Sequence, residues 1–124
     1  MIDHVSIGVS DLHASAAFYQ SVLAPLGYYK LEDRPATIGF GKKYAEFWIN
    51  LRQGCAPAGD GGNHIALRAG SREAVDAFHA AALVAGGLSD GAPGDRPHFG
   101  NGYYAAFIRD PDGNRIEAVT FLKS

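Results

Sequence analysis

The chain has 124 residues, of which 47% are hydrophobic and 19% charged, and its formal net charge is −2. This length and composition indicate one globular domain with a substantial core and exclude a disordered or fibrous chain. Because the sequence has no basic stripe and no apolar run long enough to span a bilayer, we expect neither a nucleic-acid partner nor a membrane span.

The cellular compartment is indicated by two features of the sequence. The N-terminus has no basic segment followed by an apolar one, so no secretory signal is predicted. Cys55 is the only cysteine, which excludes an intrachain disulfide and is typical of a reducing compartment. We therefore expect a cytoplasmic protein in which Cys55 has no special role.

The first half of the chain predicts one strand, one helix and three further strands. Residues 2–9 alternate as in a strand, Ser10 or Asp11 can cap a helix, and apolar residues recur at helical spacing down to Gly27. The three following strands are expected at residues 28–31, 37–40 and 45–51, with turns between them.

The second half repeats this order after a glycine-rich linker at residues 54–62. Residues 64–68 predict a strand, and Ser71 caps a helix that ends at Gly86 and Gly87. Residues 89–102 predict a long loop with room for a short strand. The last two strands are expected at residues 103–109 and 114–122, joined by a tight turn at residues 110–113.

The two halves also match residue by residue. His4 corresponds to His64 and Phe18 to Phe78, and each pair is separated by 60 positions. We therefore predict an α+β fold in a single domain (residues 1–124), with one βαβββ module at about residues 1–53 and another at about 63–124. The two modules would form curved mixed sheets around a shared cleft. The equivalent strands that begin with His4 and His64 can direct two imidazoles to one point.

Glu117 is the third residue that suggests a metal site. It lies in an otherwise apolar strand, where a carboxylate is costly to bury unless it is paired or bound to a metal. Taken alone, Glu117 fits a solvent-facing position on a half-exposed strand. Together, His4, His64 and Glu117 suit zinc, iron(II), manganese, nickel or cobalt and leave positions free for substrate.

The order of these elements, together with the ending at residues 110–117 (DPDGNRIE), resembles the vicinal oxygen chelate superfamily. Glyoxalase I, methylmalonyl-CoA epimerase, extradiol dioxygenases, fosfomycin-resistance thiol transferases and bleomycin-binding proteins belong to it. The resemblance covers nearly the whole chain and implies that His4, His64 and Glu117 are ligands of one divalent metal ion. The metal would bind two vicinal oxygens of a small substrate.

The sequence departs from the family pattern at the fourth ligand position, on the last strand of the first module. Overlaying residues 46–49 on residues 115–118 puts Trp48 there, where glyoxalase I has Glu and the epimerase has Gln. An overlay shifted by two residues would put Glu46 there instead. Because tryptophan cannot bind a metal or transfer a proton, the Trp48 alignment disfavours glyoxalase I chemistry and leaves a three-ligand site.

Four further residues are candidates for the cleft. Arg96 suits an anionic group, His98 suits proton transfer, and a tyrosine at 103 or 104 suits a hydrogen bond to a developing oxyanion. Strand alternation allows only one of the two tyrosines to face the cleft. We expect His98 and Tyr103 to act on protons, and Arg96, Tyr104 and Trp48 to contact the substrate.

Two functions remain open from the sequence. One is a metal-dependent enzyme that performs isomerisation or lysis, thiol transfer or ring cleavage. The other is a metal-free protein that sequesters a small molecule, as the bleomycin-binding relatives do. The resemblance also implies a homodimer, in which His4 of one chain can share a site with His64 and Glu117 of the other.

Overall fold

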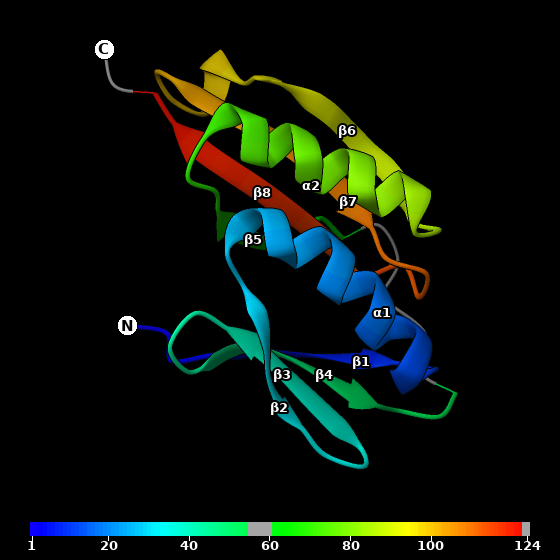
Figure 1. Cartoon of the computed structure of the whole chain (residues 1–124). Coiled ribbons are helices and arrows are strands. Elements are labelled where there is room, and N and C mark those ends of the chain that lie inside the picture. Colours follow the sequence, from blue (N-terminus) through cyan, green and yellow to red (C-terminus); the bar gives the residue numbers. More distant parts are fainter. Residues whose placement is uncertain (55–60, 123–124) are drawn as a thin grey trace.

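The computed structural model describes residues 1–54 and 61–122, and these form the two modules expected from the sequence (Figure 1). The first module consists of β1 (Val5–Val9), α1 (Leu12–Leu23), the 3-10 turn η1 (Ala24–Leu26), β2 (Tyr29–Asp33), β3 (Thr37–Gly41) and β4 (Ala45–Leu51). The second consists of β5 (Ile65–Arg68), α2 (Arg72–Val84), β6 (Leu88–Asp95), the 3-10 turn η2 (Pro97–Phe99), β7 (Tyr103–Arg109) and β8 (Arg115–Phe121).

Each module forms its own four-stranded mixed sheet. The strand orders are β1-β4-β3-β2 and β5-β8-β7-β6, so the two sheets have the same topology. In both, the first strand runs parallel to the last, and the remaining neighbours are antiparallel. The predicted α+β fold with two tandem modules is confirmed.

The helices begin where short polar residues cap them. The Asp11 carboxylate accepts a hydrogen bond from the Ala14 N–H at 3.0 Å, and the Ser71 hydroxyl accepts one from the Ala74 N–H at 3.1 Å. Of the two capping residues predicted for α1, Asp11 is therefore the one that caps it. None of the helices in the described part of the chain is long and apolar enough to cross a membrane.

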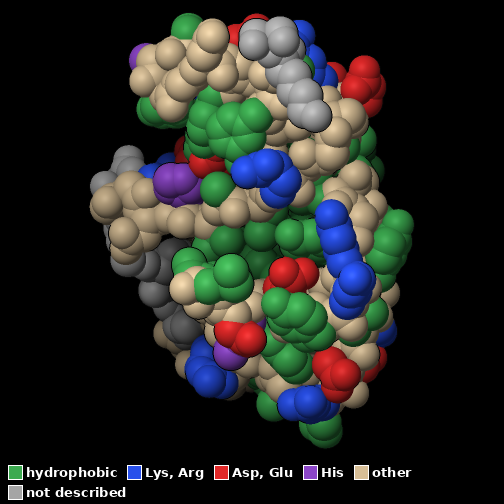
Figure 2. Space-filling view, turned by 90° about the vertical axis from the view of Figure 1, so that its left-hand side faces the viewer, with side chains coloured by type: hydrophobic (Ala, Val, Ile, Leu, Met, Phe, Trp, Pro, Cys, Tyr) green, Lys and Arg blue, Asp and Glu red, His purple; other side chains and the backbone are tan. Residues whose placement is uncertain are grey.

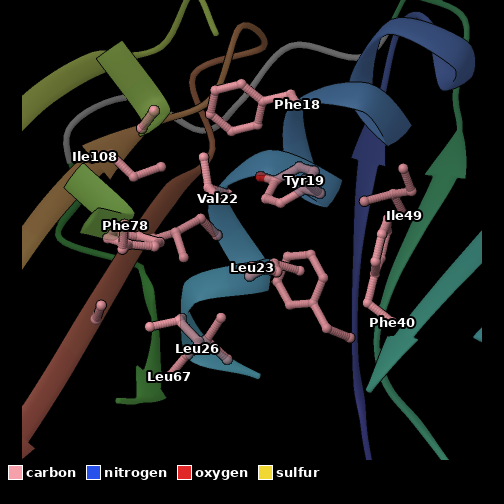
Figure 3. Close-up of a cluster of buried hydrophobic side chains, with 14 of the residues drawn as sticks. Phe18, Tyr19, Val22, Leu23, Leu26, Phe40, Ile49, Leu67, Phe78 and Ile108 are labelled. Atoms are coloured by element: carbon pink, nitrogen blue, oxygen red, sulfur yellow. The ribbon is translucent and has the colours of Figure 1, made fainter. Parts of the chain in front are cut away.

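The hydrophobic core joins the two modules. Each helix covers one face of the sheet in its own module, and α1 packs against α2. Figure 3 shows apolar side chains of both modules pointing toward one another, among them Phe18, Leu23, Phe40, Phe78 and Ile108. The face of each sheet that points away from its helix carries Trp48 in the first module and Glu117 in the second.

Polar contacts to the turn between β7 and β8 also fasten the modules together. The buried Tyr19 hydroxyl donates to Asp110 at 2.6 Å, and the Asn114 side-chain amide donates to the Gly8 carbonyl at 3.0 Å. At the surface, the Ser10 hydroxyl donates to Asp112 at 2.6 Å. The residues that make the DPDGN ending recognisable thus hold the two modules in one orientation.

Two segments predicted to be irregular, the long loop and the linker, are only partly seen as such. The long loop expected at residues 89–102, with room for a short strand, contains a longer one, because β6 occupies Leu88–Asp95 and pairs with β7. Its glycines hide the strand pattern, and the pairing shifts register near Gly91 and Gly94. The predicted linker falls largely on residues 55–60, including Cys55, which lie outside the described residues.

Candidate functional site

Glu117 is the most deeply buried ionisable side chain of the second sheet, with a relative exposure of 1%. In the sheet register it lies between Ala66 of β5 and Phe107 of β7. Strand alternation places its neighbours Ile116 and Ala118 in the core against α2, so Glu117 is on the opposite face. The carboxylate is therefore buried by the side chains that close over this face and not by the core.

His64 contacts this carboxylate from the start of β5. Its Nε2 lies 2.9 Å from Oε1 of Glu117, while its Nδ1 lies 3.0 Å from the Gly62 carbonyl oxygen. A carbonyl can only accept a hydrogen bond, so the second contact requires a hydrogen on Nδ1. A neutral imidazole then has a lone pair on Nε2, which would face the carboxylate oxygen directly. This arrangement requires either a proton shared by Nε2 and Oε1 or a cation that both groups bind.

Tyr103 contacts the other oxygen of the same carboxylate. Its hydroxyl donates a hydrogen bond to Oε2 of Glu117 across the β7–β8 pair. Burial, and then the hydrogen bond to Glu117, raise the pKa of Tyr103 from 10.0 to about 12. Tyr103 is therefore a neutral proton donor at physiological pH.

Aromatic and cationic side chains surround these three residues. Phe107 meets the His64 ring edge-on at 5.9 Å, and Phe121 meets Tyr103 in the same way at 5.2 Å. The guanidinium of Arg68 lies 4.6 Å from the centre of the Phe121 ring, and that of Arg96 lies 5.6 Å from the Phe107 ring. The site thus combines one buried carboxylate with an apolar wall and two nearby cations.

His4 lies at the start of β1, and its Nδ1 is 2.7 Å from the Asp3 carboxylate. A pocket of about 360 Å³ is lined by residues from both modules, and His4, Glu46 and His64 are among them. Figure 2 shows a hollow on one face of the molecule with hydrophobic side chains at its base and histidine, acidic and basic side chains around it. Within residues 1–54 and 61–122, no three His, Cys, Asp or Glu side chains come close enough together to hold a metal ion. The structure therefore brings His64 and Glu117 together, and His4 shares a pocket with His64 without joining them.

The register of the first sheet identifies the residue that corresponds to Glu117. Ser6 pairs with Trp48, and its counterpart 60 residues later, Ala66, pairs with Glu117. Trp48 therefore occupies the equivalent position, in agreement with the first of the two overlays. Glu46 lies two residues earlier on the same face of β4, and burial, and then the charge of Glu46, raise the pKa of Tyr28.

The remaining candidates lie in different surroundings. His98 is exposed in η2 with its ring 4.1 Å from that of Phe99, and Arg96 donates to the Ala92 carbonyl at 2.7 Å. Tyr104 points to the side of β7 away from Tyr103 and donates to Asp76 of α2 at 2.6 Å. Of the two tyrosines, Tyr103 is the one that meets Glu117.

Three neighbours of the site were not among the sequence candidates. Phe107, Phe121 and Arg68 share the face of Glu117 in the sheet register, but all three look like ordinary strand residues in the sequence. Counting alternate positions from Glu117 along its own strand would have suggested Phe121. Phe107 would have required the pairing of β7 with β8. Arg68 would also have required the pairing of β5 with β8.

Comparison with known proteins agrees with this arrangement. Residues 1–118 match the sequence profile described as the Glyoxalase/Bleomycin resistance protein/Dioxygenase superfamily. The chain belongs to this superfamily. A protein of Bacillus subtilis strain 168, YqjT, is 32% identical over 126 residues, which cover 94% of this chain and 95% of YqjT.

Solved structures of the superfamily also resemble the chain. The crystal structure of a glyoxalase/bleomycin resistance protein from Albidiferax ferrireducens T118 has a TM-score of 0.83 and 33% identity, and the match covers 94% of this chain and 95% of that one. A glyoxalase/bleomycin resistance protein/dioxygenase family enzyme from Burkholderia phytofirmans PsJN has a TM-score of 0.72 and 21% identity, with 98% of each chain covered. The latter similarity shows the shared fold alone.

Proposed function

We propose that this superfamily member is a divalent-metal-dependent enzyme that acts on a small substrate with two vicinal oxygens. The observation that carries the proposal is the contact between His64 and Glu117. A buried carboxylate and an imidazole whose Nδ1 donates to a backbone carbonyl form the arrangement in which proteins commonly orient a histidine toward a metal.

In this proposal, Glu117 and the Nε2 atom of His64 hold the metal ion, and His4 completes the ligand set. Since His4 does not join the pair within one chain, the third ligand comes from a second copy in a homodimer. Zinc, iron(II), manganese, nickel and cobalt all suit two imidazoles and one carboxylate. When bound, the metal supplies Lewis-acid polarisation of the two substrate oxygens.

The other residues of the site act on the substrate and its protons. Tyr103 holds a proton on its hydroxyl, next to Glu117, where it can be donated to a developing oxyanion. Phe107 and Phe121 exclude water from this side of the carboxylate. Because Trp48 supplies neither a fourth ligand nor a base, thiol transfer or ring cleavage fits the site better than glyoxalase I isomerisation.

Elemental analysis of protein purified without chelator tests the proposal. We expect near-stoichiometric divalent metal in the wild type and its loss in His64→Ala and Glu117→Gln. Glu73→Gln and His13→Ala are matched controls, because Glu73 is exposed on α2 and His13 on α1, outside the pocket that His4 and His64 line, and both should retain the metal. A wild type that holds no metal, and binds none when each of the five ions is offered, would overturn the proposal.

The alternative function is metal-free sequestration of a small molecule, as in bleomycin-binding relatives. The position of Trp48 supports it, because an indole at the place of a ligand favours contact with a flat molecule over metal binding. Under this alternative, a hydrogen bond joins Nε2 of His64 to Oε1 of Glu117. Nitrogen NMR of His64 distinguishes the two, since Nε2 is expected to be in a hydrogen bond without metal and to coordinate the ion when metal is bound.

A further inference from the structure

Trp48, the only tryptophan of the chain, lies half-buried on the face of the first sheet that points away from α1. Its ring rests on Gly39 of β3, its neighbour in the sheet register. A Cβ atom at residue 39 would lie 2.7 Å from the Ala45 Cβ and 3.0 Å from two carbons of the indole, so glycine lets both side chains lie against the strand. The first sheet therefore presents a flat aromatic surface at the position where the second sheet has Glu117.

Positive charge gathers around this surface. The guanidinium of Arg34 lies 5.2 Å from the centre of the indole ring. A pocket of about 520 Å³ opens over Trp48, and it is lined by Leu31, Glu32, Arg34, Lys43, Tyr44, Ala45 and Trp48. Two of these side chains are cationic and one is acidic, so the pocket is positive although the chain as a whole is negative.

The cationic side chains of the pocket are able to pair with a ligand. Arg34 contacts Glu32 at 3.2 Å in an exposed ion pair, which is a weak interaction in water. Lys43 has no ion-pair partner in the described part of the chain. A ligand carboxylate can therefore replace Glu32 as the partner of Arg34, whose planar fork suits a carboxylate and also stacks on aromatic rings.

We propose that the pocket over Trp48 binds a small aromatic carboxylate, with its ring stacked on the indole and its carboxylate held by Arg34 and Lys43. An uncharged aromatic molecule would gain no charge interaction with Arg34 or Lys43, and an aliphatic acid would lose the stacking. This proposal rests on the proposed function in one respect: it takes small aromatic carboxylates to be the substrate class of the enzyme. The binding itself requires no metal.

The single indole N–H signal of Trp48 in a nitrogen–proton NMR spectrum reports on the pocket directly. We expect benzoate to shift this signal in a saturable titration with a dissociation constant of about 1–10 mM, typical of a ligand of this size. Cyclohexanecarboxylate has the charge without the aromatic ring, and benzamide has the ring without the charge. Each should bind about tenfold more weakly than benzoate.

Arginine variants test whether the charge of Arg34 holds the ligand carboxylate. Arg34→Leu should weaken benzoate binding about tenfold and leave benzamide binding unchanged. Arg52→Leu removes the same charge at an exposed residue outside the pocket lining, so it should leave both affinities unchanged. Equal affinities for the three ligands, or equal effects of the two arginine variants, would overturn the proposal.

The same titration on Glu117→Gln separates this inference from the proposed function. Benzoate should bind this variant with unchanged affinity, because the pocket is built by the first sheet alone. If the wild type binds metal but benzoate does not shift the Trp48 signal, the ligand proposal fails and the metal proposal stands. If the wild type binds benzoate but no metal, the ligand proposal stands and the metal proposal fails.

Discussion

At the scale of single residues, Tyr103 and His64 decide the properties of the Glu117 carboxylate. Each contacts one of its two oxygens, and the aromatic side chains around them keep water away. A carboxylate that is 1% exposed keeps its charge only when such partners stabilise it. The same burial makes the neutral form of the Tyr103 phenol the favoured one.

The raised pKa of Tyr103 predicts a pH dependence of stability. Since the folded pKa of about 12 lies above the ordinary 10.0, folding favours the neutral phenol. The stabilisation is complete below pH 10 and is lost as the pH rises toward 12. We expect Tyr103→Phe to lower the free energy of unfolding by about 1–3 kcal/mol at pH 8, with a difference that shrinks above pH 10.

Urea denaturation of both proteins at several pH values measures this difference. Tyr44→Phe is the control, because Tyr44 is 56% exposed and should change stability by less than about 0.5 kcal/mol. A pH-independent difference between wild type and Tyr103→Phe would show that the hydrogen bond to Glu117 does not control the ionisation of Tyr103.

At the scale of elements, the turn between β7 and β8 connects the modules. Asp110 is 3% exposed and accepts hydrogen bonds from the Tyr19 hydroxyl, the Asn114 side chain and two backbone N–H groups. Burial raises the pKa of Asp110 above its ordinary value, although these hydrogen bonds lower it. This turn lies against α1 of the other module, so its polar groups fix how the two sheets are oriented.

Tyr19→Phe tests the contribution of this contact. The substitution removes one donor from a buried carboxylate, so we expect the free energy of unfolding to fall by about 1.5–3 kcal/mol. Tyr104→Phe is a matched control, because the Tyr104 hydroxyl donates to Asp76 at the same 2.6 Å distance but at the surface. It should cost less than about 1 kcal/mol. Equal losses in thermal or urea denaturation would contradict a special role for the buried contact.

At the scale of the whole molecule, the proposed metal site depends on a second chain. Within the described part of one chain, His4 does not complete the pair formed by His64 and Glu117. In the proposed homodimer, His4 would come from the partner. Metal binding would then depend on association of the two chains.

Mixing two variants that each lack one metal ligand tests whether metal binding depends on association of the chains. His4→Ala and Glu117→Gln should each bind no metal when alone. In a mixed dimer, the chain with intact His4 meets the chain with intact Glu117, so one of the two sites is complete. We expect co-refolding of the two variants to restore metal binding, measured by elemental analysis after gel filtration. No restoration in a demonstrated mixed dimer would place the three ligands in a single chain.

The sequence alone determined the features that depend on local pattern. The repeat at a spacing of 60 residues predicted two equivalent modules, a cap at Ser10 or Asp11 and another at Ser71 predicted where the helices begin, and alternation predicted most of the strands. These features follow from backbone geometry and side-chain periodicity within a few residues of each other. Strand β6 was predicted only as a short strand for which the loop had room, because its glycines and its irregular pairing obscure the alternation.

Only the tertiary structure decided which side chains meet. The pairing of Ala66 with Glu117 and of Ser6 with Trp48 depends on strand register, and a shift of one residue would reverse both faces. The closing of Tyr103 and His64 over Glu117 depends on two strands and a loop that are distant in sequence. The separation of His4 from this pair is likewise set by the packing of α1 on α2 and by the buried contact between Tyr19 and Asp110, which fix the orientation of the modules.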